Sequence, residues 1–164
     1  MKSKKIICVL LAVIFVGGLV IVNRNSSQKQ IDMANAMQLI MEINSEEKVY
    51  YYSEDHRAYT TFDTQMKRKN GDVFDKNYSG IPMADILKDM DVQTSEDTTV
   101  TVVCADQYEI VLTGSEILAD GNVYLITRES GEKLAEEDGN FMLVVNRDEF
   151  STRWAKNVVK VKVQ

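Results

Sequence analysis

The sequence predicts an α+β fold, a mostly β domain with a mixed sheet and a few short helices, placed after one N-terminal transmembrane helix. Short runs of β-forming residues recur along the chain, separated by turn signals such as Asn70-Gly71. Residues 81–90 place apolar side chains at spacings of three and four after a proline, which indicates a short helix. The stretch Ile6–Val22 is uncharged and almost wholly apolar.

Length and composition fit one ordinary domain. The chain has 164 residues, with one proline and eight glycines, which argues against a disordered segment. The formal net charge is -6 and the isoelectric point is about 4.9. This balance argues against nucleic acid as a partner, because phosphate contacts require clustered Lys and Arg.

The N-terminus predicts a membrane anchor over residues 1–23. The apolar run is 17 residues long, at the lower limit for a membrane-spanning helix. No small-x-small cleavage site follows it, and Cys8 lies too early for lipid attachment, so we favour an uncleaved signal anchor over a signal peptide. Three lysines precede the run, which predicts a cytoplasmic N-terminus and an extracytoplasmic domain. Cleavage would instead give a secreted domain.

Residues 24–45 are predicted to form a polar tether and a juxtamembrane helix. The apolar residues between Ile31 and Ile43 have an approximately helical spacing. Such a helix would pack on the domain or pair with a second chain. The domain itself is then expected over residues 46–164.

The first half of the domain reads as strands followed by a helix. Residues 46–62 are rich in tyrosine and β-formers, with a turn expected near Ser53–His56. The turn at Asn70-Gly71 follows, and then the helix with Pro82 in its first turn. The helix presents one apolar face, made by Met83, Ile86, Leu87 and Met90.

The second half is predicted to be mainly strands. Thr99–Leu112 reads as two strands around a tight turn, with Val100, Val102 and Cys104 on one face. A helical turn is expected at residues 113–118, and strands at 122–130 and 141–146. The C-terminal "NVVKVKV" alternates apolar residues with lysine, as a half-buried edge strand would.

The order of these segments resembles the molybdopterin-binding domain of the sulfite-oxidase type. The resemblance rests on "YSGIPMADILKDMDV", "TVTVVCADQYEIVL", "VYLITRESGEKLAEEDGNFMLVVN" and "RWAKNVVKVKV", which follow one another from Tyr78 to Val163. It covers about half of the chain. It implies a mixed α+β domain with a mostly β core, and molybdopterin as the cofactor of the family's enzymes.

Two departures from the family pattern bear on function. The turn that is commonly Asp-Gly is Asp106-Gln107 here, although such a turn favours glycine because it needs a positive φ. The resemblance also implies a molybdenum-ligating cysteine before the Gly-hydrophobe-Pro helix. No cysteine lies between Cys8 and Cys104, so we predict no metal ligand and no catalytic residue.

The resemblance leaves three candidate cofactor-binding residues. Related enzymes place the basic residues of the last segment near the pterin phosphate, which makes Arg153 and Lys156 candidates for an anion site. Tyr108 matches the tyrosine of the family's turn. The alternative is structural: a solvated basic strand edge beside a core Trp154, with Tyr108 serving in packing.

The two remaining reactive side chains favour structural interpretations. Cys104 is expected to be a buried thiol, with a reactive or intermolecular thiol and a metal ligand as alternatives. His56 lies in the charged segment "SEDHR" and is expected to be a solvated loop residue.

These observations predict a membrane-anchored extracytoplasmic domain that acts as a non-catalytic binding or interaction module. Its protein partner or small-molecule ligand is not indicated, and no cofactor is expected. The alternative is a redox protein that binds a pterin or another anionic cofactor through Arg153 and Lys156, with a partner subunit supplying what is missing. An unrelated small β domain is the remaining possibility.

Overall fold

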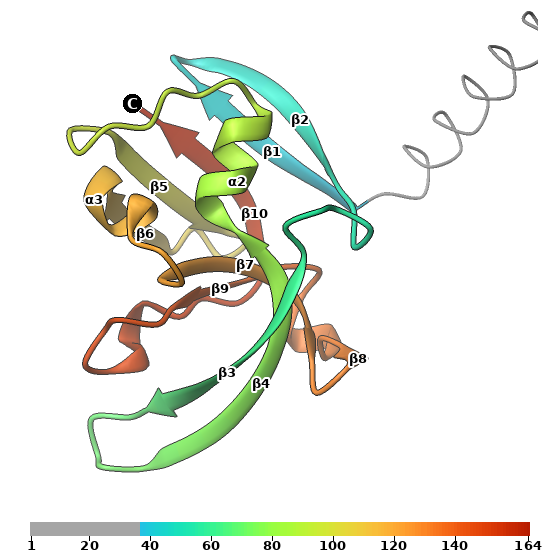
Figure 1. Cartoon of the computed structure of the whole chain (residues 1–164), viewed down its shortest axis with the longest axis vertical. Helices are drawn as coiled ribbons and strands as arrows, with labels where there is room; N and C mark the ends of the chain where they lie inside the picture. Colours follow the sequence, from blue (N-terminus) through green and yellow to red (C-terminus); the bar gives the residue numbers. More distant parts are fainter. Residues whose placement is uncertain (1–36) are drawn as a thin grey trace, which may run out of the picture. The chain divides into compact units, whose positions relative to one another are not determined.

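A computed structural model describes residues 37–164, which form one compact unit (Figure 1). The predicted anchor and most of the predicted tether lie outside the described residues. Within residues 37–164, no helix is long and apolar enough to cross a membrane.

The first sheet joins the two ends of the described chain. Its strand order is β2-β1-β10-β5-β6. The strands are β1 (Met37–Ile43), β2 (Glu46–Tyr52), β5 (Thr99–Cys104), β6 (Glu109–Thr113) and β10 (Val158–Val163). β1 and β10 run parallel and the other neighbours antiparallel, so the sheet is mixed as predicted.

The second sheet has the order β3-β4-β7-β8, with β9 also paired to β7. Its strands are β3 (Thr60–Lys67), β4 (Val73–Pro82), β7 (Val123–Glu129), β8 (Glu132–Lys133) and β9 (Met142–Val145). The β3–β4 hairpin is long and curved, and its turn end extends away from the first sheet (Figure 1).

The helices are short. They are α2 (Met83–Asp89), α3 (Gly114–Leu118) and the 3₁₀ turns η1 (Glu136–Asp138) and η2 (Ser151–Arg153). Pro82 ends β4 and is the N-cap of α2, while Thr113 caps α3 in a capping box with Glu116. Both α-helices lie where the sequence predicts them.

The core lies between the two sheets and α2. Met83, Ile86 and Leu87 of α2 are fully buried, and each such side chain contributes about 2 kcal/mol of hydrophobic stabilisation. They join one cluster with β1, β5, β6, β7 and β10. Tyr52 connects the sheets, because its hydroxyl donates to the carbonyl of Leu125 at 3.0 Å.

Two predictions about the first sheet are wrong. Met37–Ile43 is a strand and not a helix: Leu39 and Met41 are fully buried while Ile40 is exposed, which is the period of a strand. Pairing with β2 and β10 overrides the local helical spacing. The C-terminal strand is also not an edge, because β10 lies between β1 and β5.

Candidate functional site

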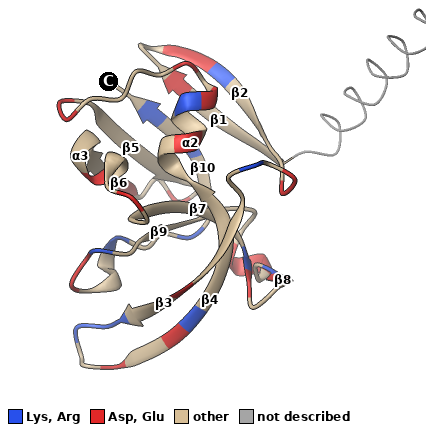
Figure 2. Cartoon of the chain, viewed as in Figure 1, with Lys and Arg blue, Asp and Glu red and all other residues tan. Residues whose placement is uncertain are grey.

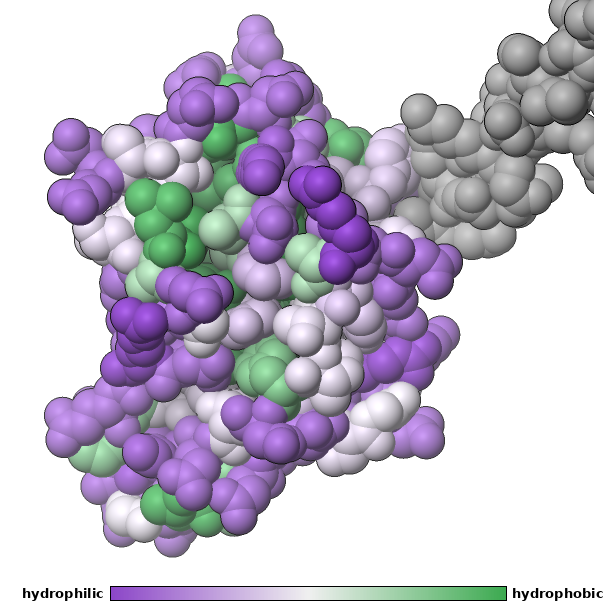
Figure 3. Space-filling model, in the orientation of Figure 1, coloured by the Kyte–Doolittle hydropathy of each residue, from purple (hydrophilic) through white to green (hydrophobic). Residues whose placement is uncertain are grey.

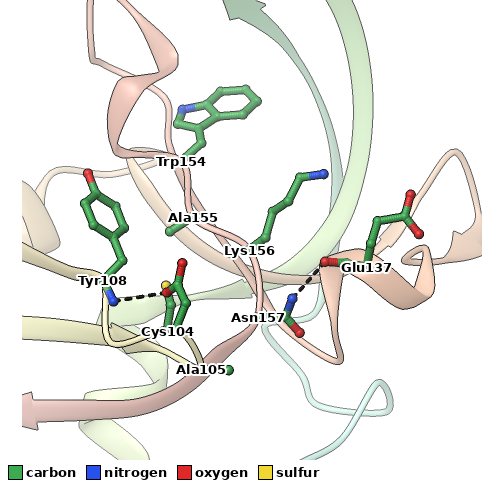
Figure 4. A pocket seen from close by; sticks show the side chains of 9 residues that line it. Cys104, Ala105, Tyr108, Glu137, Trp154, Ala155, Lys156 and Asn157 are labelled. Carbon is green, nitrogen blue, oxygen red and sulfur yellow. Dashed lines mark hydrogen bonds between the residues drawn. The ribbon is translucent and has the colours of Figure 1, made fainter.

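A pocket of about 410 Å³ lies where the β5–β6 turn, η1 and the segment before β10 meet (Figure 4). Nine residues line it: Cys104, Ala105, Asp106, Tyr108, Glu137, Trp154, Ala155, Lys156 and Asn157. Tyr108 and Lys156, which the sequence analysis singles out, therefore share one pocket.

The β5–β6 turn forms one wall of the pocket. The amide of Gln107 donates to the carbonyl of Cys104 at 3.0 Å, and the amide of Tyr108 donates to Oδ1 of Asp106 at 3.0 Å. Gln107 has a φ of 70°, in the region that favours glycine, as the departure from Asp-Gly predicts. Tyr108, which follows this turn, is 52% exposed at the pocket.

Asn157 fixes the opposite wall. Its side-chain amide donates to the carbonyl of Glu137 at 2.7 Å, and its main-chain amide donates to the carbonyl of Asp138 at 2.7 Å. Its own carbonyl accepts from the amide of Ala105 at 2.9 Å. One residue thus ties η1 to the β5–β6 turn, which gives the pocket a defined shape.

Lys156 reaches from the pocket to a buried carboxylate. Its ammonium forms an ion pair with Oδ1 of Asp138, an oxygen that is buried from solvent. The Asp138 side chain is only 12% exposed, so its charge needs this partner. The positive charge of Lys156 is consequently largely compensated.

Arg153 lies outside the pocket lining and is held by two carboxylates. Its guanidinium donates to Asp148 through Nε at 2.8 Å and to Glu116 through Nη2 at 2.6 Å. Its hydrogen bonds to these carboxylates, first to Asp148 and then to Glu116, raise the pKa of Arg153 above its ordinary value. Burial alone would raise the pKa of Glu116, but the bonds from Arg153 and Thr113 outweigh it and the pKa is lowered.

The Cys104 thiol is a poor nucleophile and a poor metal ligand in this setting. The residue is 3% exposed, as the sequence predicts for a buried thiol. Burial, and secondly the negative charge of Asp106, raises its pKa. A thiolate is the form that attacks and ligates, and both effects disfavour it.

Trp154 forms the inner part of the site. Its indole N–H donates to the carbonyl of Val145 at 2.9 Å, and its ring meets the Tyr78 ring edge-on, with centroids 5.9 Å apart. It packs against the core cluster that contains α2 and against a second, smaller cluster, while still lining the pocket. The second cluster consists of Tyr78, Tyr124, Ile126, Met142 and Val144.

The described residues do not fit a molybdenum cofactor. The family resemblance implies a cysteine thiolate as the molybdenum ligand, and burial raises the pKa of Cys104, the thiol among the described residues, which disfavours its thiolate. An anionic pterin would need free cations, yet Arg153 and Lys156 are each paired with carboxylates. In residues 37–164, no three His, Cys, Asp or Glu side chains come together as a metal site would require.

Sequence reasoning missed Glu137, Asp138 and Asn157. Their contacts join segments about 20 to 50 residues apart, and no local pattern shows such contacts. The sharp turn at Asp138-Gly139 was the available signal, since Gly139 has a φ of 73° and a side chain there would collide with Asn157.

His56 is not the solvated loop residue that the sequence suggested. Its Nε2 lies 2.9 Å from Oδ2 of Asp89, and its Nδ1 accepts from the amide of Ala58 at 3.1 Å. The Tyr50 hydroxyl donates to the same Asp89 oxygen at 3.2 Å. This cluster fastens the β2–β3 connection to the end of α2, away from the pocket.

Comparison with solved structures supports the architecture. The crystal structure of the sulfane dehydrogenase SoxCD from Paracoccus pantotrophus superposes with a TM-score of 0.62 at 17% sequence identity. The match covers 77% of this chain and 37% of that chain, so it shows the fold alone, and this chain spans little more than a third of that protein's length.

Comparison with curated proteins gives no match. The family model described as "Oxidoreductase molybdopterin binding domain" matches residues 16–164. This is nearly the whole chain, and it extends the resemblance that the sequence shows from Tyr78 onwards. The chain belongs to the oxidoreductase molybdopterin-binding domain family.

Proposed function

We propose that this protein is a membrane-anchored extracytoplasmic binding module, which uses the family's fold without molybdenum catalysis. The anchor is the apolar segment Ile6–Val22, and the basic residues before it give the orientation. The pocket between the β5–β6 turn and η1 is the place for a small ligand, and the exposed surface is available to a protein partner.

The observation that carries the proposal is that the basic side chains of the site are already paired with carboxylates. Arg153 is compensated by two carboxylates and Lys156 by a buried one. Two further acidic residues, Asp106 and Glu137, are among those that line the pocket. An anionic cofactor would have to displace or face these charges, which makes its binding unfavourable.

A redox protein that binds a pterin or another anionic cofactor is the second candidate. It is favoured by one observation, that Tyr108 and Lys156 line the same pocket. The Lys156 side chain is 58% exposed, so its ammonium could exchange Asp138 for a ligand phosphate. Lys156→Gln combined with Asp138→Asn, which leaves no unpaired buried charge, would then abolish cofactor retention while the fold persists.

Cofactor content separates the two candidates. The full-length chain would be produced in a host that synthesises molybdopterin and purified in detergent. Molybdenum would be measured by mass spectrometry and pterin by fluorescence after oxidation. We expect neither, and stoichiometric molybdenum or pterin would overturn the proposal.

A variant tests the charge argument itself. Asp138→Asn removes the carboxylate that compensates Lys156. Trp154 is the only tryptophan of the chain and lines the pocket, so its fluorescence reports on ligand entry. We expect pyrophosphate to quench the variant and not the wild type; equal quenching of both would show that Lys156 is free already.

A further inference from the structure

The turn end of the β3–β4 hairpin combines basic and apolar side chains on an extended arm. We define the hairpin tip as residues 67–74, "KRKNGDVF". Lys67 ends β3 and pairs with Val73, which begins β4. Figure 1 shows this end of the hairpin extending away from the first sheet.

The turn holds the hairpin tip in a defined conformation. The amide of Arg68 donates to the carbonyl of Asp72 at 2.9 Å, and the amide of Gly71 donates to the carbonyl of Arg68 at 3.0 Å. Gly71 has a φ of 96°, which glycine adopts without strain. The tip is therefore ordered before any partner arrives, which lowers the entropic cost of binding.

The charge of the hairpin tip is opposite to that of the domain. Residues 37–164 hold 14 Lys and Arg against 24 Asp and Glu, a formal net charge of -10. Lys67, Arg68 and Lys69 are consecutive and exposed, and they belong to none of the ion pairs among the described residues. The Asp72 carboxylate accepts from the Asn70 side chain at 2.8 Å. Figure 2 shows the basic segment at the end of β3.

Two large apolar side chains are exposed beside these cations. Val73 is 53% and Phe74 39% exposed, although neighbouring strand residues point to opposite faces. Both stay exposed although the tip touches η2, where the amide of Lys67 donates to Oγ of Ser151 at 2.9 Å. The Arg68 guanidinium lies 4.9 Å from the centre of the Phe74 ring. Figure 3 shows hydrophobic atoms among hydrophilic ones at this end of the molecule.

We propose that the hairpin tip is a contact site for an anionic lipid surface. Its cations would face the headgroups, while Val73 and Phe74 enter the interfacial layer. Clustered Lys and Arg beside exposed apolar side chains are typical of segments that lie in this layer. An acidic protein would be attracted by the cations alone, whereas the exposed Val73–Phe74 pair favours a lipid surface. The inference does not depend on the pocket or its ligand.

The lipid surface can be tested with the full-length chain. An environment-sensitive fluorophore would be attached at Asn70→Cys in a Cys8→Ser background, with Cys104 left buried. The protein would be reconstituted with vesicles of phosphatidylcholine alone or with one third phosphatidylglycerol. We expect the emission to shift to shorter wavelength only with phosphatidylglycerol, and the shift to diminish when salt is raised.

Two variants separate the contribution of the cations from that of the apolar side chains. Replacing Lys67, Arg68 and Lys69 by glutamine should lower the equilibrium constant for contact between the tip and the phosphatidylglycerol surface about 100-fold, and so remove most of the blue shift, because each surface cation contributes about fivefold. Val73→Ser with Phe74→Ser should weaken the blue shift and leave most of the salt dependence. Thermal unfolding of both variants should match the wild type, since these side chains are exposed.

A second label position completes the control. The same fluorophore at Asp97→Cys, in an exposed loop, should not respond to phosphatidylglycerol. An equal shift at both positions, a shift with phosphatidylcholine alone, or no shift at Asn70→Cys would each overturn the proposal. A shift produced by an acidic protein in place of vesicles would do the same.

Discussion

At the residue scale, Arg153 illustrates how a side chain suited to anions can serve the fold. It joins Glu116 of α3 to Asp148 in the loop after β9. The guanidinium therefore ties the segment after β9 to α3, which lies more than thirty residues earlier in the chain. This arrangement explains the residue without a cofactor.

Arg153→Gln should destabilise the domain by about 1–2 kcal/mol, because two carboxylates lose a charged hydrogen-bond partner and solvent screens part of the loss. The Arg153 side chain is 32% exposed, so the effect should stay below that of a fully buried ion pair. Urea unfolding would measure it. The more peripheral pair of Lys162 with Glu109 gives the control, and Lys162→Gln should change stability less. An equal loss of stability in both variants would show that Arg153 does not stabilise the fold more than the Lys162–Glu109 pair does.

The same contacts predict a loss of stability in acid. Hydrogen bonds from Arg128 lower the pKa of Glu54, and those from Arg153 and Thr113 lower that of Glu116 against the effect of burial. A carboxyl whose pKa is lowered by folding stabilises the fold above its ordinary pKa, and the contribution is lost as pH falls through the folded value. The urea midpoint should therefore be constant near neutrality and fall below the ordinary pKa of 4.5. A midpoint that rises in acid would contradict these contacts.

Cys104 should react slowly. Burial and the Asp106 charge raise its pKa, so little thiolate is present near neutral pH. In a Cys8→Ser chain, alkylation by iodoacetamide should be at least about ten times slower in the folded than in the unfolded protein. Intact mass would give both rates, and rapid reaction of the folded protein would restore Cys104 as a candidate nucleophile.

At the element scale, β4 and α2 explain why the family's Gly-hydrophobe-Pro pattern persists in this chain. β4 carries an irregularity between Ser79 and Gly80 where it pairs with β7. A side chain on Gly80 would lie 2.4 Å from the Leu125 carbonyl and 2.6 Å from Ile126 Cα. Pro82 then ends the strand and starts α2. The pattern is thus a packing requirement between β4 and β7.

Gly80→Ala should destabilise the domain by about 1–3 kcal/mol, because β7 backbone must move to admit the methyl group. Thr60→Ala is the matched control, since Thr60 is exposed and pairs with Gly80 on the same rung of the hairpin. Urea unfolding of the two variants should separate them clearly. A Gly80→Ala protein as stable as the control would show that β4 and β7 are less closely packed than described.

Local sequence patterns predicted most helices and strands of the fold, but not which strands pair with one another. The β5–β6 hairpin and α2 follow from period-two alternation and from the Pro82 position, which are properties of neighbouring residues. Met37–Ile43 was misassigned because its spacing suits either structure, and β10, which decides it, is more than a hundred residues away. The central position of β10 was missed for the same reason.

The site was predicted only where the family resemblance supplied it. Tyr108 and Lys156 share a pocket, and Arg153 lies beside it with its charge compensated. The carboxylates that compensate Arg153 and Lys156 could not be assigned from the sequence, because 25 Asp and Glu residues are spread along the chain. Which of them meets a given cation is decided by tertiary packing.

At the scale of the whole molecule, the chain keeps the architecture of a cofactor-binding family while its charges oppose an anionic cofactor. The family model covers residues 16–164, and the fold matches a domain of a much longer dehydrogenase. The domain is acidic overall, and its candidate cations are paired. We infer that binding, and not molybdenum chemistry, is what this scaffold provides.

Native mass spectrometry of the full-length chain, extracted from membranes of a host that synthesises molybdopterin, tests this claim most directly. This method measures the mass of the protein together with any cofactor, ligand or partner that stays bound to it. We predict the mass of the polypeptide alone, or of the polypeptide with a partner or ligand that contains no molybdenum. A mass increased by one molybdopterin with its metal, in stoichiometric amount, would contradict the account.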